Sequence, residues 1–269
     1  MKKLKMYMPF ATNSFQAELA YKGNTIMFIL GESILMIVTA FLWRAIYGSA
    51  EDTILNGFSL NEMIIYMIIA FLTNLVITND CISSIYREVK DGSVAMNLIK
   101  PISYTKRMMF QTFGQIFFNF ILVFLPALIV VEIIYTKLTG YFSPINLILY
   151  CLSALLSMLL NFYYCYCFGL LAFKITNMWG LNQIMGAISK LLSGTLIPLI
   201  FFPSIVTKIF NLLPFSSIIS TPTLIYLGKL KGMDMVKGIL FQVIWVIIFM
   251  LLARWIWKKL IKQITILGG

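Results

Sequence analysis

The sequence predicts an all-α integral membrane protein that forms a single transmembrane domain over residues 1–269. Of these residues 60% are hydrophobic and 12% are charged, whereas soluble globular chains are about half apolar and a quarter charged. Six apolar stretches reach or approach the roughly 20 residues that a helix needs to cross a bilayer. They are apolar on all faces, which favours helices over barrel strands. The six stretches cover residues 25–47, 60–78, 110–135, 145–173, 181–202 and 239–257.

Residues 4–22 precede the first span and predict an amphipathic helix that lies in the membrane interface. Phe10, Phe15 and Leu19 are interleaved here with polar residues such as Glu18, a mixture typical of interfacial helices. An irregular tail is the alternative interpretation of this segment.

Basic residues predict the orientation of the spans, because Lys and Arg in short loops favour the cytoplasmic side. Six spans with both termini in the cytoplasm place three basic regions on that side. The loop between the fifth and sixth spans is also basic and disagrees, since this topology makes it external. The three regions contain Lys2, Lys3 and Lys5, then Arg87, Lys90, Lys100, Lys106 and Arg107, and finally Arg254, Lys258, Lys259 and Lys262.

The longest polar connection, residues 79–107, joins the second and third spans. Apolar residues recur in its first half at helical spacing. Asp91 and Gly92 predict a turn, and residues 94–99 predict a second short helix that stops before Pro101. Such an elbow suits a hydrophobic groove on a soluble partner, and a solvated helical extension is the other interpretation. The candidate docking residues are Ile82, Ile85, Tyr86, Arg87, Glu88, Val89, Asp91 and Gly92.

The connection between the fifth and sixth spans predicts short helices that dip into the outer leaflet without crossing it. Residues 201–227 are too apolar for a free loop, yet prolines interrupt the region, and proline breaks helices. Irregular backbone at membrane depth has to be buried in protein or line a wet cavity. A seventh full span is the alternative, but the prolines leave too few uninterrupted residues for it. These prolines are Pro198, Pro203, Pro214 and Pro222.

Three of the charged residues within the predicted spans stand out, because charge is costly there and therefore points to function. Glu32 lies in the first span, Glu132 near the outer end of the third, and Lys190 in the middle of the fifth. Glu32 and Lys190 are candidates for a polar translocation path or an ion pair between helices. Alternatively, Lys190 extends toward the interface and Glu32 is protonated or bound to water.

Several functional classes are excluded by what the sequence lacks. It has no histidine, which removes His-based catalysis and His metal sites. The phosphate-binding patterns GxxxxGK[ST] and GxGxxG are absent, so no nucleotide site is expected. The net charge of +11 is explained by topology and anionic lipid rather than by nucleic acid. The cysteines are expected to pack structurally without a metal, and they are Cys81, Cys151, Cys165 and Cys167.

Three regions, taken in chain order, resemble motifs of the type-2 permeases of ABC transporters. Residues 18–22 (ELAYK) resemble the entry to the first span, with Lys22 in place of an arginine. Residues 90–101 (KDGSVAMNLIKP) resemble a cytoplasmic signature in which glycine precedes a short apolar helix ending in Leu-x-Lys-Pro. The outer re-entrant region of the family resembles residues 194–203 (GTLIPLIFFP), 213–215 (LPF) and 222–228 (PTLIYLG). The resemblance covers nearly the whole chain, and it is to the branch of paired bacterial permeases and viologen-type exporters.

The resemblance implies a permease subunit of an ATP-driven exporter in the bacterial inner membrane. Two separate ATPase subunits would bind ATP and Mg²⁺, so this chain would be neither an enzyme nor the holder of a cofactor. A second permease, identical or homologous, would complete the pore among membrane lipids. The coupling helix would lie at about residues 82–91, and the cargo would be a drug, lipid, glycolipid or peptide. The outer re-entrant gate would contain Pro198, Phe202, Pro203, Pro214 and Phe215.

Two other functions compete with an exporter. A secondary transporter or channel without an ATPase partner predicts internal repeats or broken helices near the midplane, and residues 1–135 and 136–269 do not resemble each other. A membrane-embedded enzyme would need clustered acids, histidines or cysteines, which the sequence does not provide.

Overall fold

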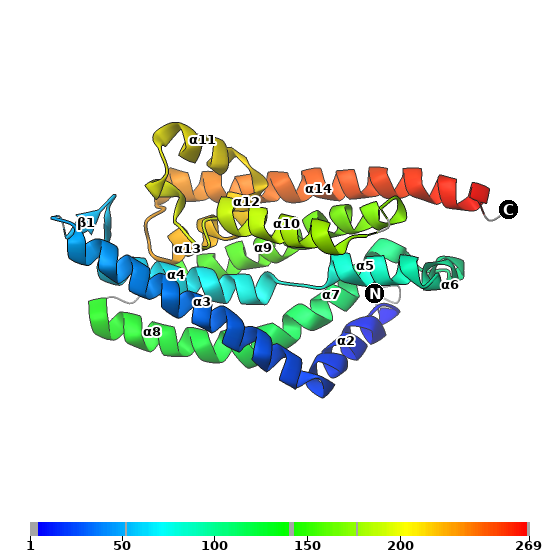
Figure 1. The fold of residues 1–269 in the computed structure, drawn as a ribbon, viewed down its shortest axis with the longest axis horizontal. Coiled ribbons are helices and arrows are strands. Elements are labelled where there is room, and N and C mark those ends of the chain that lie inside the picture. The colour runs from blue at the N-terminus through cyan, green and yellow to red at the C-terminus, as the bar shows by residue number, and fades with distance from the viewer. Residues whose placement is uncertain (1–4, 52, 140–142, 176, 268–269) are drawn as a thin grey trace.

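The computed structural model describes residues 5–51, 53–139, 143–175 and 177–267, and these residues are mainly helical (Figure 1). Within them, five helical segments are long and apolar enough to cross a membrane. The chain is therefore a multi-pass all-α membrane protein, as the sequence predicts. Lys2 and Lys3, which contribute to the predicted orientation, lie outside the described residues. The five segments are Lys22–Ser49, Leu60–Lys90, Tyr104–Ile134, Pro144–Phe173 and Gly232–Lys262.

The long helices run side by side along the long axis of the molecule (Figure 1). A small β-hairpin marks one end, and the short helices α5 (Cys81–Lys90) and α6 (Ser93–Ile99) mark the other. We call these the hairpin end and the α5–α6 end. The helices that form the five segments are α3 (Lys22–Ser49), α4 (Leu60–Ile77), α7 (Tyr104–Asn119), α8 (Leu125–Thr139), α9 (Pro144–Gly169) and α14 (Gly232–Leu267).

The predicted fifth span is not one continuous helix. Over residues 181–202 the sequence predicts a full crossing, but α10 (Trp179–Leu192) has only 14 residues. At 1.5 Å per residue it is about 21 Å long, shorter than the roughly 30 Å hydrocarbon core. Gly194 ends this region with a left-handed φ of +79°, and its carbonyl accepts a hydrogen bond of 2.9 Å from the Tyr66 hydroxyl. A side chain at position 194 would be strained and would collide with that hydroxyl.

The third segment is helical throughout but not uniform. Between α7 and α8 the backbone widens into one π-helical turn, Phe120–Phe124. Pro126 follows in the first turn of α8 and has no N–H to donate to the preceding turn. In the π turn the regular i→i−4 hydrogen bonds of the α-helix are already interrupted, at the place where proline would remove one of them.

The N-terminal segment forms α2 (Met8–Ala20), which lies obliquely across the bundle and packs against α7 (Figure 1). Gly114 makes this approach possible, because a Cβ there would lie 2.2 Å from the backbone oxygen of Ala11. Aromatic contacts reinforce it, with the Tyr7 and Phe110 rings stacked at 5.5 Å. The helix expected at residues 4–22 is therefore present over most of that range, and its position is fixed by contacts with the bundle.

A two-stranded hairpin at the end of α3 departs from the all-helical expectation. Strands β1 (Ile54–Leu55) and β2 (Phe58–Ser59) pair in antiparallel fashion around the turn at Asn56 and Gly57, the dipeptide that two-residue hairpins favour. The Tyr47 hydroxyl donates a 2.8 Å hydrogen bond to the Phe58 carbonyl, which ties the hairpin back to α3.

Three short helices occupy the connection before α14, where the sequence predicts broken helices in place of a span. They are α11 (Ser204–Leu212), α12 (Pro214–Ile218) and α13 (Ser220–Tyr226). The side chains of α11 are partly or fully exposed, whereas most of those in α12 and α13 are buried against α9 and neighbouring helices. The last two helices therefore insert into the bundle.

A buried polar cluster holds α12 in place. The fully buried Gln242 of α14 donates to the Ser217 carbonyl at 2.8 Å and to the Ser157 hydroxyl at 3.1 Å. Its own carbonyl accepts a 2.9 Å bond from the Ser153 hydroxyl. One amide side chain thus joins α14, α9 and the backbone of α12, where an unpaired carbonyl would be costly.

We expect Gln242→Leu to lower the free energy of unfolding by about 1–3 kcal/mol, because it leaves buried polar groups without partners. Thermal denaturation of the purified protein in detergent measures this loss. Gln16→Leu, on the exposed side of α2, is the matched control and should change little. Equal stability of the two variants would contradict the role given to Gln242.

Candidate functional site

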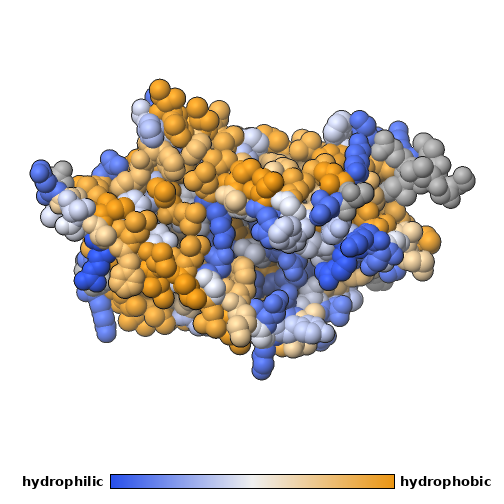
Figure 2. All heavy atoms as spheres, in the orientation of Figure 1, coloured by the Kyte–Doolittle hydropathy of each residue, from blue (hydrophilic) through white to orange (hydrophobic). Residues whose placement is uncertain are grey.

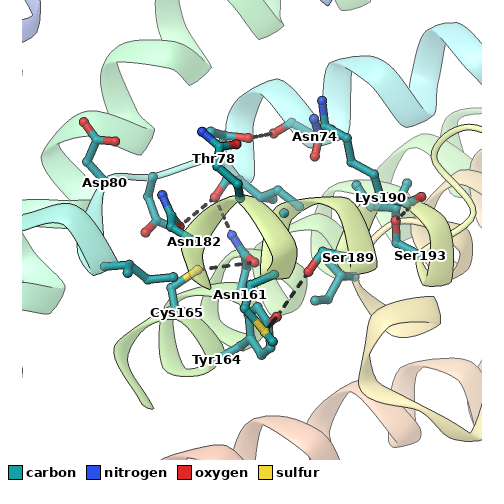
Figure 3. A pocket seen from close by; sticks show the side chains of 18 of the residues that line it. Asn74, Thr78, Asp80, Asn161, Tyr164, Cys165, Asn182, Ser189, Lys190 and Ser193 are labelled. Atoms are coloured by element: carbon teal, nitrogen blue, oxygen red, sulfur yellow. Dashed lines mark hydrogen bonds between the residues drawn. The ribbon is translucent and has the colours of Figure 1, made fainter. Parts of the chain in front are cut away.

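The main candidate site is a cavity of about 350 Å³ between the helices, on the α5–α6 side of the α12–α13 segment. Its walls come from α3, α4, α9 and α10 and from the 78–80 link between α4 and α5, and their side chains converge on a common space (Figure 3). Figure 2 shows hydrophilic residues in a hollow between α3 and α10, bordered by hydrophobic surface. The polar lining residues are Glu32, Asn74, Thr78, Asn79, Asp80, Asn161, Tyr164, Asn182, Gln183, Ser189, Lys190 and Ser193.

The two intramembrane charges singled out in the sequence meet at the edge of this cavity. Lys190 Nζ lies 2.6 Å from Glu32 Oε1, and the two side chains are 32% and 15% exposed. The ion pair connects α3 with α10. Neither charge therefore faces the apolar surroundings alone. Such pairing is expected because an unpaired charge within the membrane is costly.

Several of the polar lining groups are already used to satisfy the backbone. Helix α4 ends at Ile77, and its carbonyl accepts from the Asn79 and Asn161 side-chain amides at 3.0 and 2.7 Å. Thr78 donates to the Asn74 carbonyl at 2.7 Å. These bonds stabilise an interruption between α4 and α5 that would otherwise leave polar backbone unpaired.

Other polar side chains in the cavity have no such partner. Within the described part of the chain, the amides of Asn74, Asn182 and Gln183 and the carboxylate of Asp80 make no hydrogen bond or ion pair to protein. Sequence reasoning missed these four residues. A usable signal was present for Asp80 alone, since it belongs to a polar run that directly follows the apolar stretch of the second span.

The tip between α12 and α13 closes the cavity toward the hairpin end, where Ile218 and Ile219 line its wall. Phe215 packs edge-on against Tyr164, with ring centroids 5.4 Å apart. The other predicted gate residues lie farther along the same connection. Pro198 and Pro214 are buried, Phe202 is half-buried and packs on Phe210, and Pro203 is exposed.

Removing one member of the Glu32–Lys190 pair is expected to destabilise the protein, because a charge would remain unpaired within the bundle. For Lys190→Met we expect a loss of about 2 kcal/mol in the free energy of unfolding. The double variant Glu32→Gln/Lys190→Met should recover most of it. Thermal unfolding in detergent provides the measurement, with Lys208→Met on exposed α11 as the control. A double variant no more stable than the single one would show that the two residues are not coupled.

The candidate docking residues in α5 divide into an inner and an outer set. Ile82 and Ile85 are 6% and 0% exposed, and they pack into the core. Tyr86 and Val89 are half-buried, and Arg87, Asp91 and Gly92 are exposed. The apolar stripe of α5 therefore faces the bundle, and the docking role predicted for Ile82 and Ile85 stays a prediction.

Glu88 also faces inward. Its two carboxylate oxygens accept from Arg107 Nη2 at 2.7 and 2.6 Å, and its Oε2 accepts from the Tyr104 hydroxyl at 3.0 Å and from Asn97 at 3.2 Å. The Glu88 and Arg107 side chains are 15% and 6% exposed. Glu88 thus joins α5, α6 and α7 through an internal ion pair with Arg107.

Helix α6, the second helix of the predicted elbow, exposes apolar side chains at this end, although none of them was among the candidate docking residues. Met96 and Ile99 are 66% and 78% exposed. The predicted turn between the two helices is present, with Gly92 at a φ of +76°. Hydrogen bonds from the Ser93 hydroxyl and backbone N–H hold the pKa of Asp91 below its ordinary value, so this turn carries a negative charge at neutral pH.

Metal and thiol chemistry find no support in this part of the chain. Among the described residues, no group of three or more acidic, cysteine or histidine side chains could hold a metal ion. The four cysteines are not bonded to one another.

Comparison with known proteins gives one finding. A family model described as "ABC-2 family transporter protein" matches residues 33–268, which is most of the chain. No curated protein matches.

Proposed function

The chain belongs to the ABC-2 family of transporter proteins, and we propose that it is the membrane-spanning permease of an ATP-driven exporter for an amphipathic substrate. The observation that carries the proposal is the polar cavity among otherwise apolar helices, closed toward one end by inserted short helices. Such a cavity can hold a polar group at membrane depth, since it supplies hydrogen-bonding side chains where lipid supplies none.

In the proposed topology α10 and residues 193–203 together make a sixth crossing, and α11 to α13 form the re-entrant region on the outside. The α5–α6 end and both termini then face the cytoplasm of a bacterial cell. Exposed Arg87, Lys90 and Lys100 at this end support the orientation. Lys229, Lys231 and Lys237, which follow α13, are the exception, because this topology places them outside.

Cysteine labelling tests this topology. In a background without native cysteines, single cysteines introduced at Ser49 and Thr136 are expected to react with a membrane-impermeant thiol reagent added outside the cell. A cysteine at Ser103 is expected to react only after the cells are opened. Labelling of position 103 in intact cells would reverse the proposed orientation.

The same proposal implies two kinds of protein partner, an ATPase and a second permease. Two copies of a separate ABC ATPase would bind ATP and Mg²⁺ and dock at the α5–α6 end. A second permease, identical or homologous, would face this one within the lipid. Helix α3 supports this arrangement, because it leaves most of its apolar side chains exposed.

Purification from the native cell in mild detergent tests the function. An ATPase subunit should co-purify, and its ATP hydrolysis should depend on the presence of the permease. Transport by the purified chain alone, with no ATPase and no requirement for ATP, would instead establish a secondary transporter or channel.

A further inference from the structure

We infer that the cavity binds an uncharged head group that bears several hydroxyls, such as a sugar, on an amphipathic molecule. This inference rests on the proposed function, and it selects one substrate class among those that an exporter could carry. It starts from the side chains that the protein itself leaves without partners.

The chemistry of the unpartnered groups defines the ligand. Asn74, Asn182 and Gln183 each present an N–H donor pair and a carbonyl acceptor, whereas Asp80 presents acceptors alone. A hydroxyl can donate to the carboxylate and to the amide carbonyls, and it can accept from the amide N–H groups. A head group with several hydroxyls therefore matches the chemistry of the half-buried amides of Asn74 and Asn182 and of the exposed side chains of Gln183 and Asp80.

The charges of the cavity disfavour an anionic head group. Of the described residues that line it, Lys190 is the sole cation, and Glu32 already neutralises it at 2.6 Å. The exposed Asp80 adds one negative charge that has no counter-ion among the described residues. Phosphate recognition normally uses free Arg or Lys donors, so a phosphate would find repulsion here and no cation to pair with.

The apolar surface beside the ion pair gives the tail a place to lie. On its other side lies a small hollow of about 30 Å³, lined mainly by apolar side chains. The exposed apolar surface of α3 continues from it toward the lipid. A molecule with its head in the cavity and its tail along α3 would thus straddle the Glu32–Lys190 pair. The apolar lining residues are Leu35, Met36, Met67, Phe71 and Leu196.

Equilibrium binding of fluorescent lipids to the full-length protein in phosphatidylcholine nanodiscs tests the inference without an ATPase. Three probes share one short diacylglycerol tail and carry a glucose, a phosphate or a trimethylammonium head. We expect the glucosyl probe to bind at least about tenfold more tightly than either other probe, the equivalent of roughly one good hydrogen bond. Tighter binding of the phosphate or ammonium probe would overturn the inference.

Two variants locate the binding. Asn74→Leu/Asn182→Leu is expected to weaken binding of the glucosyl probe by about tenfold or more. Asn211→Leu on exposed α11 should leave the affinity for this probe unchanged. Gly186→Phe is the second variant, because Gly186 lines the cavity and a Cβ there would meet no atom within 4 Å. It should fill the cavity without disturbing the fold and remove glucosyl binding.

Undiminished binding in both variants would place the probe elsewhere and overturn the inference. Failure of these assays is distinguishable from failure of the proposed function. Loss of selectivity for the glucosyl probe, with an ATPase that still co-purifies, would leave an exporter with another substrate.

Discussion

Replacement of Glu88 by leucine is expected to lower the free energy of unfolding by about 3–5 kcal/mol, the cost of leaving one member of a buried ion pair alone. Arg107 would keep its charge at 6% exposure and lose both carboxylate contacts. Tyr104 and Asn97 would lose an acceptor at the same time. Thermal and denaturant unfolding of the purified protein in detergent measure the effect.

Two further variants test the cause. The double variant Glu88→Leu/Arg107→Leu should recover much of the lost stability, because buried ion pairs can often be replaced by apolar pairs at little cost. Lys237→Ala removes an ion pair whose side chains are 64% and 73% exposed, and it should change stability by less than about 1 kcal/mol. Wild-type stability of Glu88→Leu would show that the internal pair does not hold α5 to α7.

The second large effect is expected at α6. Met96→Asp/Ile99→Asp should weaken association with the ATPase at least about hundredfold, since each buried apolar side chain contributes roughly 1.5 kcal/mol or more and about 1.4 kcal/mol is tenfold. Both side chains are exposed in the isolated permease, so the fold should tolerate the change. Co-purification and the affinity of the ATPase for the reconstituted permease are the measurements.

Met233→Asp is the control for this experiment. Met233 is 68% exposed and lies at the start of α14, away from the α5–α6 end. It should leave ATPase binding intact. If the α6 double variant also bound the ATPase normally, this surface would not be the docking site, and the proposed mechanical link would have to lie elsewhere.

The sequence predicts the spans well where apolarity alone sets their limits. The stretch at residues 25–47 lies within α3, and that at 60–78 matches α4 closely. The fifth span is less regular than the sequence predicts, because hydropathy does not sense backbone dihedrals. Leu196 and Ile197 keep the sequence apolar after Gly194, although the helix has already ended.

The orientation of α5 could not be predicted from the sequence, for a different reason. Periodicity separates two faces of a helix but does not say which face meets a partner and which meets the bundle. Ile85 lies on the buried face with Glu88 beside it. The partner of Glu88, Arg107, is 19 residues away in sequence, so no local pattern could reveal the pair. The cavity residues Asn74 and Asn182 were missed similarly, because they meet only through folding.

The attachment of α3 determines how the cavity wall can move. Its two buried side chains, Trp43 and Tyr47, both lie in the last two turns, so the helix is anchored mainly near its C-terminal end. Glu32 lies 11 residues before Trp43, about 16 Å along the axis. A tilt of about 10° around that anchor would displace Glu32 by roughly 3 Å. That motion would break the Glu32–Lys190 ion pair and loosen the contact of Ile29 with the core. It would open the cavity sideways toward the membrane, so the proposed cargo would have a route into a leaflet instead of into water.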